Sequence, residues 1–179
     1  MAAGSSSAVR GLLQELRSWG RYLLPSKYVA VYYPTQLPVA RAMLRLAGVS
    51  SSDTVFDLGC GDGRICILAA EEFGARSVGV ELDKTLADAA AAAVAGKGLQ
   101  ERVQIINGDC RRLDVSRASV ITLYLSDAGN LELLQSVVGL RGGTRVVSLY
   151  FPVKGWEGQL LRVDRSKNID IHLYTAPEQ

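Results

Sequence analysis

A glycine-rich turn with an acidic residue in front of it is the part of the sequence best suited to chemistry. Gly59, Gly61 and Gly63 follow an apolar run at residues 54–58, and Asp57 lies within that run. Glycines permit positive φ and let a ligand approach the backbone closely. A helix beginning just after Gly63 would present free N–H groups to the same turn. We therefore expect a nucleotide-type ligand at this strand–turn–helix corner.

The spacing of the glycines separates the classes of nucleotide ligand. Dinucleotide sites use G-x-G-x-x-G, with the helix N-terminus facing a pyrophosphate, whereas this turn has G-x-G-x-G. The carboxylate of Asp57 would repel a pyrophosphate but suits a ligand that carries an ammonium group and a sulfonium. The sequence also lacks the G-x-x-x-x-G-K-[ST] pattern of a P-loop. These features favour S-adenosylmethionine, which has both cations and no phosphate, over NAD.

Two more acidic residues follow the next two predicted strands. Glu81 ends the strand at 77–81, where a carboxylate accepts hydrogen bonds from both ribose hydroxyls. Asp109 follows the strand at 103–107, where it would accept from the adenine amino group. Taken singly, Glu81 could be a surface acid, Asp109 a helix cap and the glycines an ordinary turn. Their positions at the ends of three successive strands instead predict one cofactor site.

Strands and helices alternate from residue 54 onward and would position these residues. The predicted strands are 54–58, 77–81, 103–107, 119–125 and 144–150, and the predicted helices are 37–46, 64–73, 84–95 and 130–138. Strands rich in Val, Ile and Leu between helices indicate a parallel sheet covered on both faces. Residues 160–163 and 169–174 predict two strands with no helix between them. The expected fold class is α/β: a Rossmann-like doubly wound sheet, mostly parallel, with an antiparallel C-terminal hairpin.

Composition and charge narrow the function classes. The 179 residues suffice for one domain with a sizeable core, and the formal net charge is +2 without a Lys/Arg run. Phosphate binding normally shows as a clustered basic face, so nucleic acid is disfavoured as a partner. Cys60, Cys66 and Cys110 form no CxxC pair, which favours free thiols in a reducing compartment. His172 is the only histidine, which excludes a His-rich metal site, and we expect no metal.

These motifs resemble those of class I (seven-β-strand) S-adenosylmethionine-dependent methyltransferases. A narrower combination comprises Tyr33-Pro34-Thr35, residues 57–65, residues 122–125 with Asn130, residues 143–148 and Gly155-Trp156. It is similar to the small protein-lysine methyltransferases, a group that includes the archaeal broad-specificity enzyme and the enzymes for the ATP synthase c-subunit and the adenine nucleotide translocase. The resemblance implies methyl transfer to a lysine side chain of a protein substrate.

The chain departs from this group at two places. Cys60 stands where the group often has Ser, which is a change between small residues. Ser126-Asp127-Ala128 follows the fourth strand, where these enzymes often carry Leu-Pro. Because that position faces the reaction centre, the choice of acceptor stays open.

A lysine acceptor needs an apolar environment, because its amine has a pKa of about 10.4 in water and desolvation favours the neutral form. The candidates to line such a channel are aromatic: Tyr33, Tyr124, Tyr150, Phe151 and Trp156. The resemblance implies that Tyr33 and Thr35 cover the methionine end of the cofactor. From their positions at the end of the predicted fourth strand and just after it, we expect Tyr124 to contact both the cofactor and the acceptor, and Asp127 is a candidate to orient the amine. Alternatively, Tyr124 and Tyr150 are core residues on strands, and Asp127 caps the helix starting near residue 130.

Three functions remain open from the residues alone: a protein-lysine methyltransferase, a small-molecule methyltransferase, and a cofactor-binding subunit without activity. The chain lacks the Asn/Asp-Pro-Pro-Tyr/Phe turn of the enzymes that methylate exocyclic amines. Small-molecule enzymes usually carry an inserted lid, for which the chain has little room. These two points favour the protein-lysine enzyme, which we expect to be a monomer.

Residues 1–27 differ in composition from the remainder. They are basic, serine-containing and apolar at helical spacing. We expect them to form either an amphipathic helix, which could touch a membrane surface, or an organelle targeting segment. Residues 28–179 are expected to form the methyltransferase domain. The two alternatives leave the location open between cytoplasm and mitochondrion.

Overall fold

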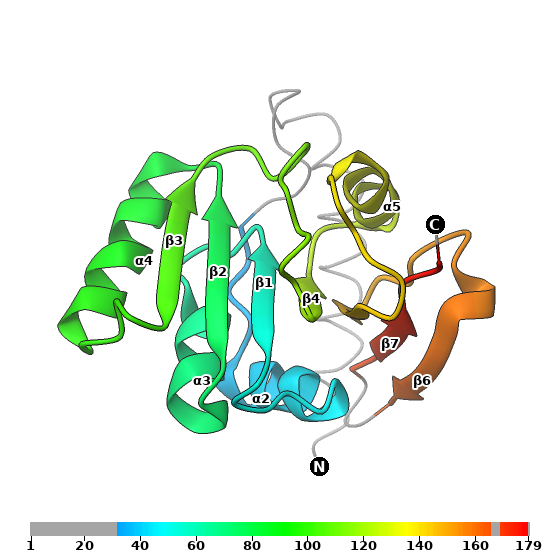
Figure 1. Ribbon diagram of the computed structural model, residues 1–179, viewed down its shortest axis with the longest axis horizontal. Coiled ribbons are helices and arrows are strands. Elements are labelled where there is room, and N and C mark those ends of the chain that lie inside the picture. The colour runs from blue at the N-terminus through cyan, green and yellow to red at the C-terminus, as the bar shows by residue number, and fades with distance from the viewer. Residues whose placement is uncertain (1–31, 166–168, 179) are drawn as a thin grey trace, which may run out of the picture.

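The computed structural model describes residues 32–165 and 169–178, and these build one seven-stranded sheet with helices on both faces (Figure 1). The strands are β1 (Thr54–Leu58), β2 (Arg76–Glu81), β3 (Val103–Asn107), β4 (Val120–Leu123), β5 (Arg145–Leu149), β6 (Leu160–Asp164) and β7 (Ile171–Thr175). Their order is β3-β2-β1-β4-β5-β7-β6. Strands β1 to β5 are parallel, and β7 pairs antiparallel with both β5 and β6. The expected fold class is confirmed, including the antiparallel C-terminal hairpin.

The four described α-helices lie at or near the predicted positions: α2 (Leu37–Leu46), α3 (Arg64–Phe73), α4 (Lys84–Gly96) and α5 (Asp127–Ser136). A short 3-10 helix, η1 (Glu157–Gln159), was not predicted. Helices α2, α3 and α4 cover one face of the sheet, and α5 covers the other. None of these described helices is long and apolar enough to cross a membrane. The expectation for residues 1–27 lies outside the described residues.

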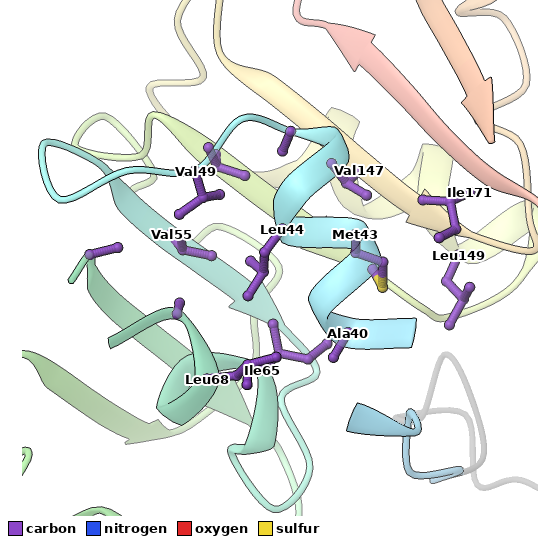
Figure 2. Packing of buried hydrophobic residues seen from close by; sticks show 14 residues of the cluster. Ala40, Met43, Leu44, Val49, Val55, Ile65, Leu68, Val147, Leu149 and Ile171 are labelled. Carbon is purple, nitrogen blue, oxygen red and sulfur yellow. The ribbon is translucent and has the colours of Figure 1, made fainter. Parts of the chain in front are cut away.

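Alternate residues of the strands supply two cores, one for each face. Val55 of β1 packs with Met43 and Leu44 of α2 on one face (Figure 2). Its neighbour Phe56 packs with Leu133 of α5 on the other. Because successive strand residues point to opposite faces, each strand ties the two helix layers together. This double attachment holds the strand ends, and the turns that follow them, in fixed positions.

Five strands and two helices differ from their predicted bounds by one to three residues. Strands β4 and β5 end at Leu123 and Leu149, one or two residues before the predicted ends. Helix α5 begins at Asp127 because the Ser126 hydroxyl accepts from the Gly129 N–H at 2.9 Å and caps the helix. The alternative in which Asp127 caps a helix starting near residue 130 is therefore wrong.

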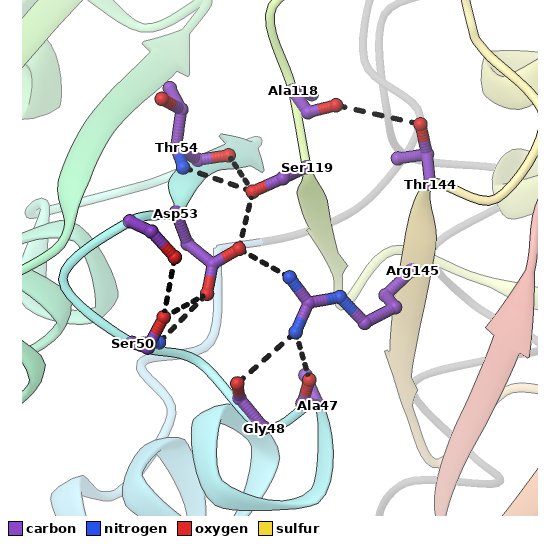
Figure 3. Close-up of polar contacts among 10 residues, drawn as sticks. Ala47, Gly48, Ser50, Asp53, Thr54, Ala118, Ser119, Thr144 and Arg145 are labelled. Carbon is purple, nitrogen blue, oxygen red and sulfur yellow. Dashed lines mark hydrogen bonds and ion pairs between the residues drawn. The ribbon is translucent and has the colours of Figure 1, made fainter.

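A polar network fastens the amino ends of three strands to the end of α2 (Figure 3). The nearly buried Asp53 carboxylate accepts from the Ser119 hydroxyl at 2.7 Å and pairs with Arg145. The Arg145 guanidinium also donates to the carbonyls of Ala47, at 2.6 Å, and Gly48. The network lies at the edge of the sheet opposite the glycine turn, so it supports the fold without entering the site.

Candidate active site

The predicted cofactor residues meet at the carboxyl edge of the parallel strands. Asp57 of β1 is in register with Gly79 of β2 and Thr122 of β4, and Glu81 is in register with Asn107 at the end of β3. The chain runs outward from β1 to β3 in one direction and returns to β4 and β5 in the other. This reversal beside β1 is where open α/β sheets bind ligands.

The three glycines of the turn all have left-handed backbones. Their φ angles are 88° at Gly59, 56° at Gly61 and 77° at Gly63, in the region that residues with a Cβ rarely adopt. The N–H groups of Gly59 and Cys60 both donate to the Val80 carbonyl, at 2.9 and 3.0 Å. The turn is therefore held against β2, and its glycines place no side chain of their own in the way of a ligand.

Glu81 is fixed in place by the turn that it adjoins. One carboxylate oxygen accepts from the Gly61 N–H and the other from the Asp83 N–H, each at 2.9 Å. Asp83 in turn caps α4 by accepting from the N–H groups of Thr85 and Leu86. Carboxylate oxygens have further lone pairs, so the half-buried Glu81 can still accept from the two ribose hydroxyls.

Asp57 lies beneath the turn and is buried. Its carboxylate accepts from the Thr122 hydroxyl at 2.7 Å. Burial raises the pKa of Asp57 to about 7, against the lowering effect of the Thr122 hydrogen bond, and the negative charges of Glu81 and Asp62 raise it further. A ligand with two positive charges would favour the ionised form of this acid. The residues at the strand ends thus fit S-adenosylmethionine.

Asp109 is exposed and already has a partner. The Arg111 guanidinium donates to its carboxylate at 2.6 and 3.0 Å, which holds the pKa of Asp109 below its usual range. An adenine amino group would have to share this carboxylate with Arg111. The sequence motif did not predict that Arg111 pairs with Asp109. The only signal for it in the sequence was a basic residue two positions after the acid.

Tyr32, which sequence reasoning missed, lies over the glycine turn. A Cβ built on Gly61 would lie 2.4 Å from the Tyr32 ring, so the ring packs directly on the glycine. The predicted residue Tyr33 instead contacts Tyr124, with the ring centroids 6.5 Å apart and the planes perpendicular. The neighbouring side chains therefore separate, with Tyr32 over the turn and Tyr33 toward the end of β4.

Thr35 is buried, and its backbone joins the segment before α2 to the turn. The Arg64 guanidinium donates to the Thr35 carbonyl at 3.0 Å and forms an ion pair with Asp62. Gly79 is a third residue, after Arg111 and Tyr32, whose contact the motifs did not reveal. A Cβ there would lie 2.8 Å from the Cys60 sulfur. Both contacts depend on the folded shape of the turn rather than on spacing along the chain.

Four aromatic side chains gather beyond the ends of β4 and β5, and we call them the aromatic cluster: Tyr33, Tyr124, Tyr150 and Phe151. The Tyr124 ring is at its centre, 5.8 Å from the Tyr150 ring and 6.1 Å from the Phe151 ring. Burial and then the neighbouring hydroxyls of Tyr150 and Tyr33 raise the pKa of Tyr124 well above its usual value. Because β4 and β5 end before them, Tyr124 and Tyr150 do not lie on strands, so that part of the alternative is wrong. Both half-buried rings nevertheless pack against the core that contains α2.

Two other predicted residues have different outcomes. Trp156 packs edge-on against Tyr174, at 6.3 Å, in the core beneath α5. The structure thus places it with that core rather than in the aromatic cluster, contrary to the expectation. Asp127 opens α5, and its side chain lies outside the part of the chain that the structure describes.

Comparisons with known proteins agree with this geometry. The family model of the ANTKMT methyltransferase domain matches residues 57–159, more than half of the chain. A protein-lysine N-methyltransferase of Saccharolobus islandicus (strain REY15A) is 40% identical over 152 residues, which cover 82% of this chain and 94% of the relative.

Solved structures share the fold. An RNA methyltransferase from Salinibacter ruber, in complex with S-adenosyl-L-homocysteine, has a TM-score of 0.76 at 36% identity and covers 82% of this chain and 95% of its own. The putative methyltransferase yhhF from Escherichia coli has a TM-score of 0.64 at 14% identity, with 83% and 90% covered, and supports the fold alone. The matched family range contains the glycine turn, Glu81, Asp109 and three members of the aromatic cluster. The chain belongs to the ANTKMT methyltransferase-domain family and is an S-adenosylmethionine-dependent methyltransferase.

Proposed function

We propose that this methyltransferase acts on lysine side chains of a protein substrate. The observation that carries the proposal is the aromatic cluster next to the cofactor turn. Tyr32 packs on Gly61 while the adjacent Tyr33 contacts Tyr124, so the cluster adjoins the turn directly. The name of the Saccharolobus relative, a protein-lysine N-methyltransferase, supports the same acceptor.

The aromatic cluster supplies what a lysine acceptor requires. When bound, S-adenosylmethionine supplies an electrophilic methyl group on its sulfonium. Aromatic walls desolvate the lysine amine, which lowers its pKa and favours the neutral nucleophile. The Tyr124 phenol, whose pKa is raised, stays neutral and orients the amine by hydrogen bonding rather than removing its proton. The same aromatic faces also tolerate the cationic methylated product.

The proposed site residues follow from this division of roles. The cofactor residues are Asp57, Gly59, Gly61, Gly63, Glu81, Asp109, Thr35, Tyr33 and Tyr124. The proposed catalytic residues are Tyr33, Tyr124 and Asp127, of which Asp127 is proposed from the sequence alone. To these the contact with Gly61 adds Tyr32 as part of the cover.

Methylation assays with labelled cofactor test the acceptor class. The full chain is incubated with a cell extract and S-adenosylmethionine that carries a labelled methyl group, and mass spectrometry locates the label. We expect label on protein lysines, and no label with the cofactor-site variant Glu81→Ala. Label found only on RNA, as the name of the Salinibacter neighbour suggests for that protein, or only on small molecules would contradict the proposal.

A second proposal concerns the N-terminal segment, residues 1–27, and the location of the protein. We propose that residues 1–27 are separate from a methyltransferase domain at 28–179 and direct the protein to mitochondria. Their basic, serine-containing, amphipathic composition supports this role. A fluorescent reporter fused after residue 27 should enter mitochondria, and a variant with its arginines changed to glutamate should not. A reporter that stays in the cytosol would contradict the targeting role.

A further inference from the structure

Strand β5 ends in a three-residue turn that is strained at its centre. The Phe151 N–H donates to the Leu149 carbonyl at 2.7 Å, two residues back. Between them Tyr150 has a φ of 61°, in the region that favours glycine. A hydrogen bond between residues two positions apart, with a positive φ at the residue between them, defines the rare and strained form of the γ-turn. An aromatic residue holds this conformation only where its surroundings impose it.

Asn130 of α5 makes the side-chain hydrogen bonds that hold this turn. Its amide nitrogen donates to the Phe151 carbonyl at 3.1 Å and to the Ser148 hydroxyl at 2.8 Å, and the Ser148 hydroxyl donates to the same carbonyl. From the other side, the Tyr150 N–H donates to the Asp170 carbonyl at 2.7 Å. Helix α5, β5 and the residue before β7 therefore clamp the turn together.

The Asn130 amide carries a cost of its own. The residue is fully buried, and its carbonyl oxygen has no hydrogen-bond partner among the described residues. Rotating the amide would not help, because its oxygen would then face the Phe151 carbonyl, acceptor against acceptor. A buried acceptor without a partner is costly. Two unfavourable features, the unpaired Asn130 oxygen and the positive φ of Tyr150, are thus connected through Phe151, a member of the aromatic cluster.

We propose that Asn130 is a positioning residue that acts through the Phe151 carbonyl. By holding the γ-turn it keeps the Tyr150 and Phe151 rings against Tyr124, at 5.8 and 6.1 Å, and so sets the width of the acceptor site. This inference rests on the proposed function for its catalytic consequence, and on the contacts alone for its effect on ring positions. The hydrogen bonds from the Asn130 amide and the Ser148 hydroxyl run to each other and to Phe151, and not to the glycine turn or Glu81.

The first test measures ring positions and needs no activity. The full chain is labelled with 3-fluorotyrosine, and the fluorine resonances of Tyr124 and Tyr150 are assigned by their Tyr→Phe variants. Asn130→Ala and the milder Ser148→Ala should shift or broaden both resonances. The matched control is Thr144→Ala, which removes a buried hydroxyl bonded to a backbone carbonyl at the other end of β5. Unchanged Tyr124 and Tyr150 resonances in a folded Asn130→Ala protein would overturn the proposal.

The second test asks whether Asn130 acts through Tyr150. Asn130→Ala should lower kcat/KM for the protein acceptor by about tenfold, because a displaced wall misaligns the amine, while the cofactor Kd stays within about twofold. In a Tyr150→Gly background, where glycine adopts the turn without strain, the same Asn130→Ala change should have much less effect. Fully additive losses would overturn the role of Tyr150 as the intermediary. A wild-type protein that methylates no lysine would instead contradict the proposed function and leave the fluorine result to decide the clamp.

Discussion

Glu81, a proposed ribose ligand, is tied to the glycine turn, because its two carboxylate oxygens accept from the Gly61 and Asp83 N–H groups. Glu81→Gln replaces one acceptor oxygen with a donor that cannot accept from either the backbone or a ribose hydroxyl. We expect the cofactor Kd to rise at least tenfold, since each lost charge-assisted hydrogen bond contributes about 1.5–3 kcal/mol. Calorimetric titration measures the change, with the exposed Glu101→Gln as the matched control. Normal affinity in the Glu81 variant would show that this acid does not hold the ribose.

Asp57 should make cofactor binding depend on pH. Its pKa of about 7 without ligand means that the acid is largely protonated in mildly acidic solution. The cationic cofactor favours the ionised form, so binding releases a proton below the folded pKa, and affinity should rise with pH and level off above about 7. For the ligand-free protein the sign is opposite: the raised pKa stabilises the fold at low pH, and this contribution is lost as pH rises through about 7.

Titrations in two buffers of different ionisation enthalpy would count the released protons. We expect Asp57→Asn, which keeps an acceptor for Thr122 but cannot ionise, to bind the cofactor more weakly and with a flatter pH profile. An unchanged pH profile in the variant would assign the titration to a group other than Asp57.

The residue contacts that the sequence did not predict share one physical cause. Glycine spacing and acids at strand ends follow from chain order, so the positions of Asp57, Glu81 and Asp109 relative to the strands could be predicted from the sequence. The packing of Tyr32 on Gly61 and the hydrogen bonds of Arg111 on Asp109 arise only once the turns have closed. Spacing along the chain therefore predicts which backbone a ligand approaches, but not which side chain already lies there.

At the scale of elements, apolar periodicity predicted the sheet better than it predicted the ends of its strands. The bounds of α2, β1, α3 and β3 coincide with the predicted ones. Tyr124 and Tyr150 were assigned to strands because aromatic residues favour them. They leave the sheet for reasons beyond local propensity, since the clamp around Asn130 imposes a γ-turn at Tyr150. The errors at the ends of β4 and β5 thus fall where the aromatic cluster begins.

The ion pair between Asp53 and Arg145 should stabilise the sheet at the edge opposite the site. Although burial alone would raise it, hydrogen bonds from Ser119 and Ser50 and the charge of Arg145 hold the pKa of Asp53 below its usual value. Arg145→Ala leaves a nearly buried carboxylate without its ion-pair partner, and we expect a loss of about 2–3 kcal/mol in the free energy of unfolding.

Urea denaturation across pH measures this loss. Because the folded pKa of Asp53 is lowered, its contribution is present above about pH 4, the unfolded value, and disappears as pH falls through the folded pKa. The control is Arg41→Ala, which breaks the exposed pair with Glu72 and should change stability little. Equal effects of the two variants would mean that burial of Asp53 is unimportant.

At the scale of the whole molecule, the balance of charge favours a protein acceptor over RNA. The formal net charge is +2, and the sequence has no Lys/Arg run. A protein that binds RNA neutralises several phosphates and releases their counterions, so its affinity falls steeply with salt, with a slope of about −0.7 per phosphate for single strands. In this chain 18 acidic residues offset the 20 Lys and Arg residues, and lysine recognition by an aromatic cluster depends little on ionic strength.

We therefore expect methylation of the protein acceptor to depend weakly on salt. Between about 50 and 200 mM salt, KM for that acceptor should change by less than about threefold, whereas a protein that contacts six or more phosphates loses about a thousandfold in affinity over the same range. The measurement compares KM for the labelled protein with methylation of total RNA at the two salt concentrations, and Glu81→Gln supplies the background. Efficient RNA methylation with a steep salt slope would place the acceptor with that of the Salinibacter neighbour and contradict the lysine assignment, while the cofactor site and the seven-stranded sheet would stand unchanged.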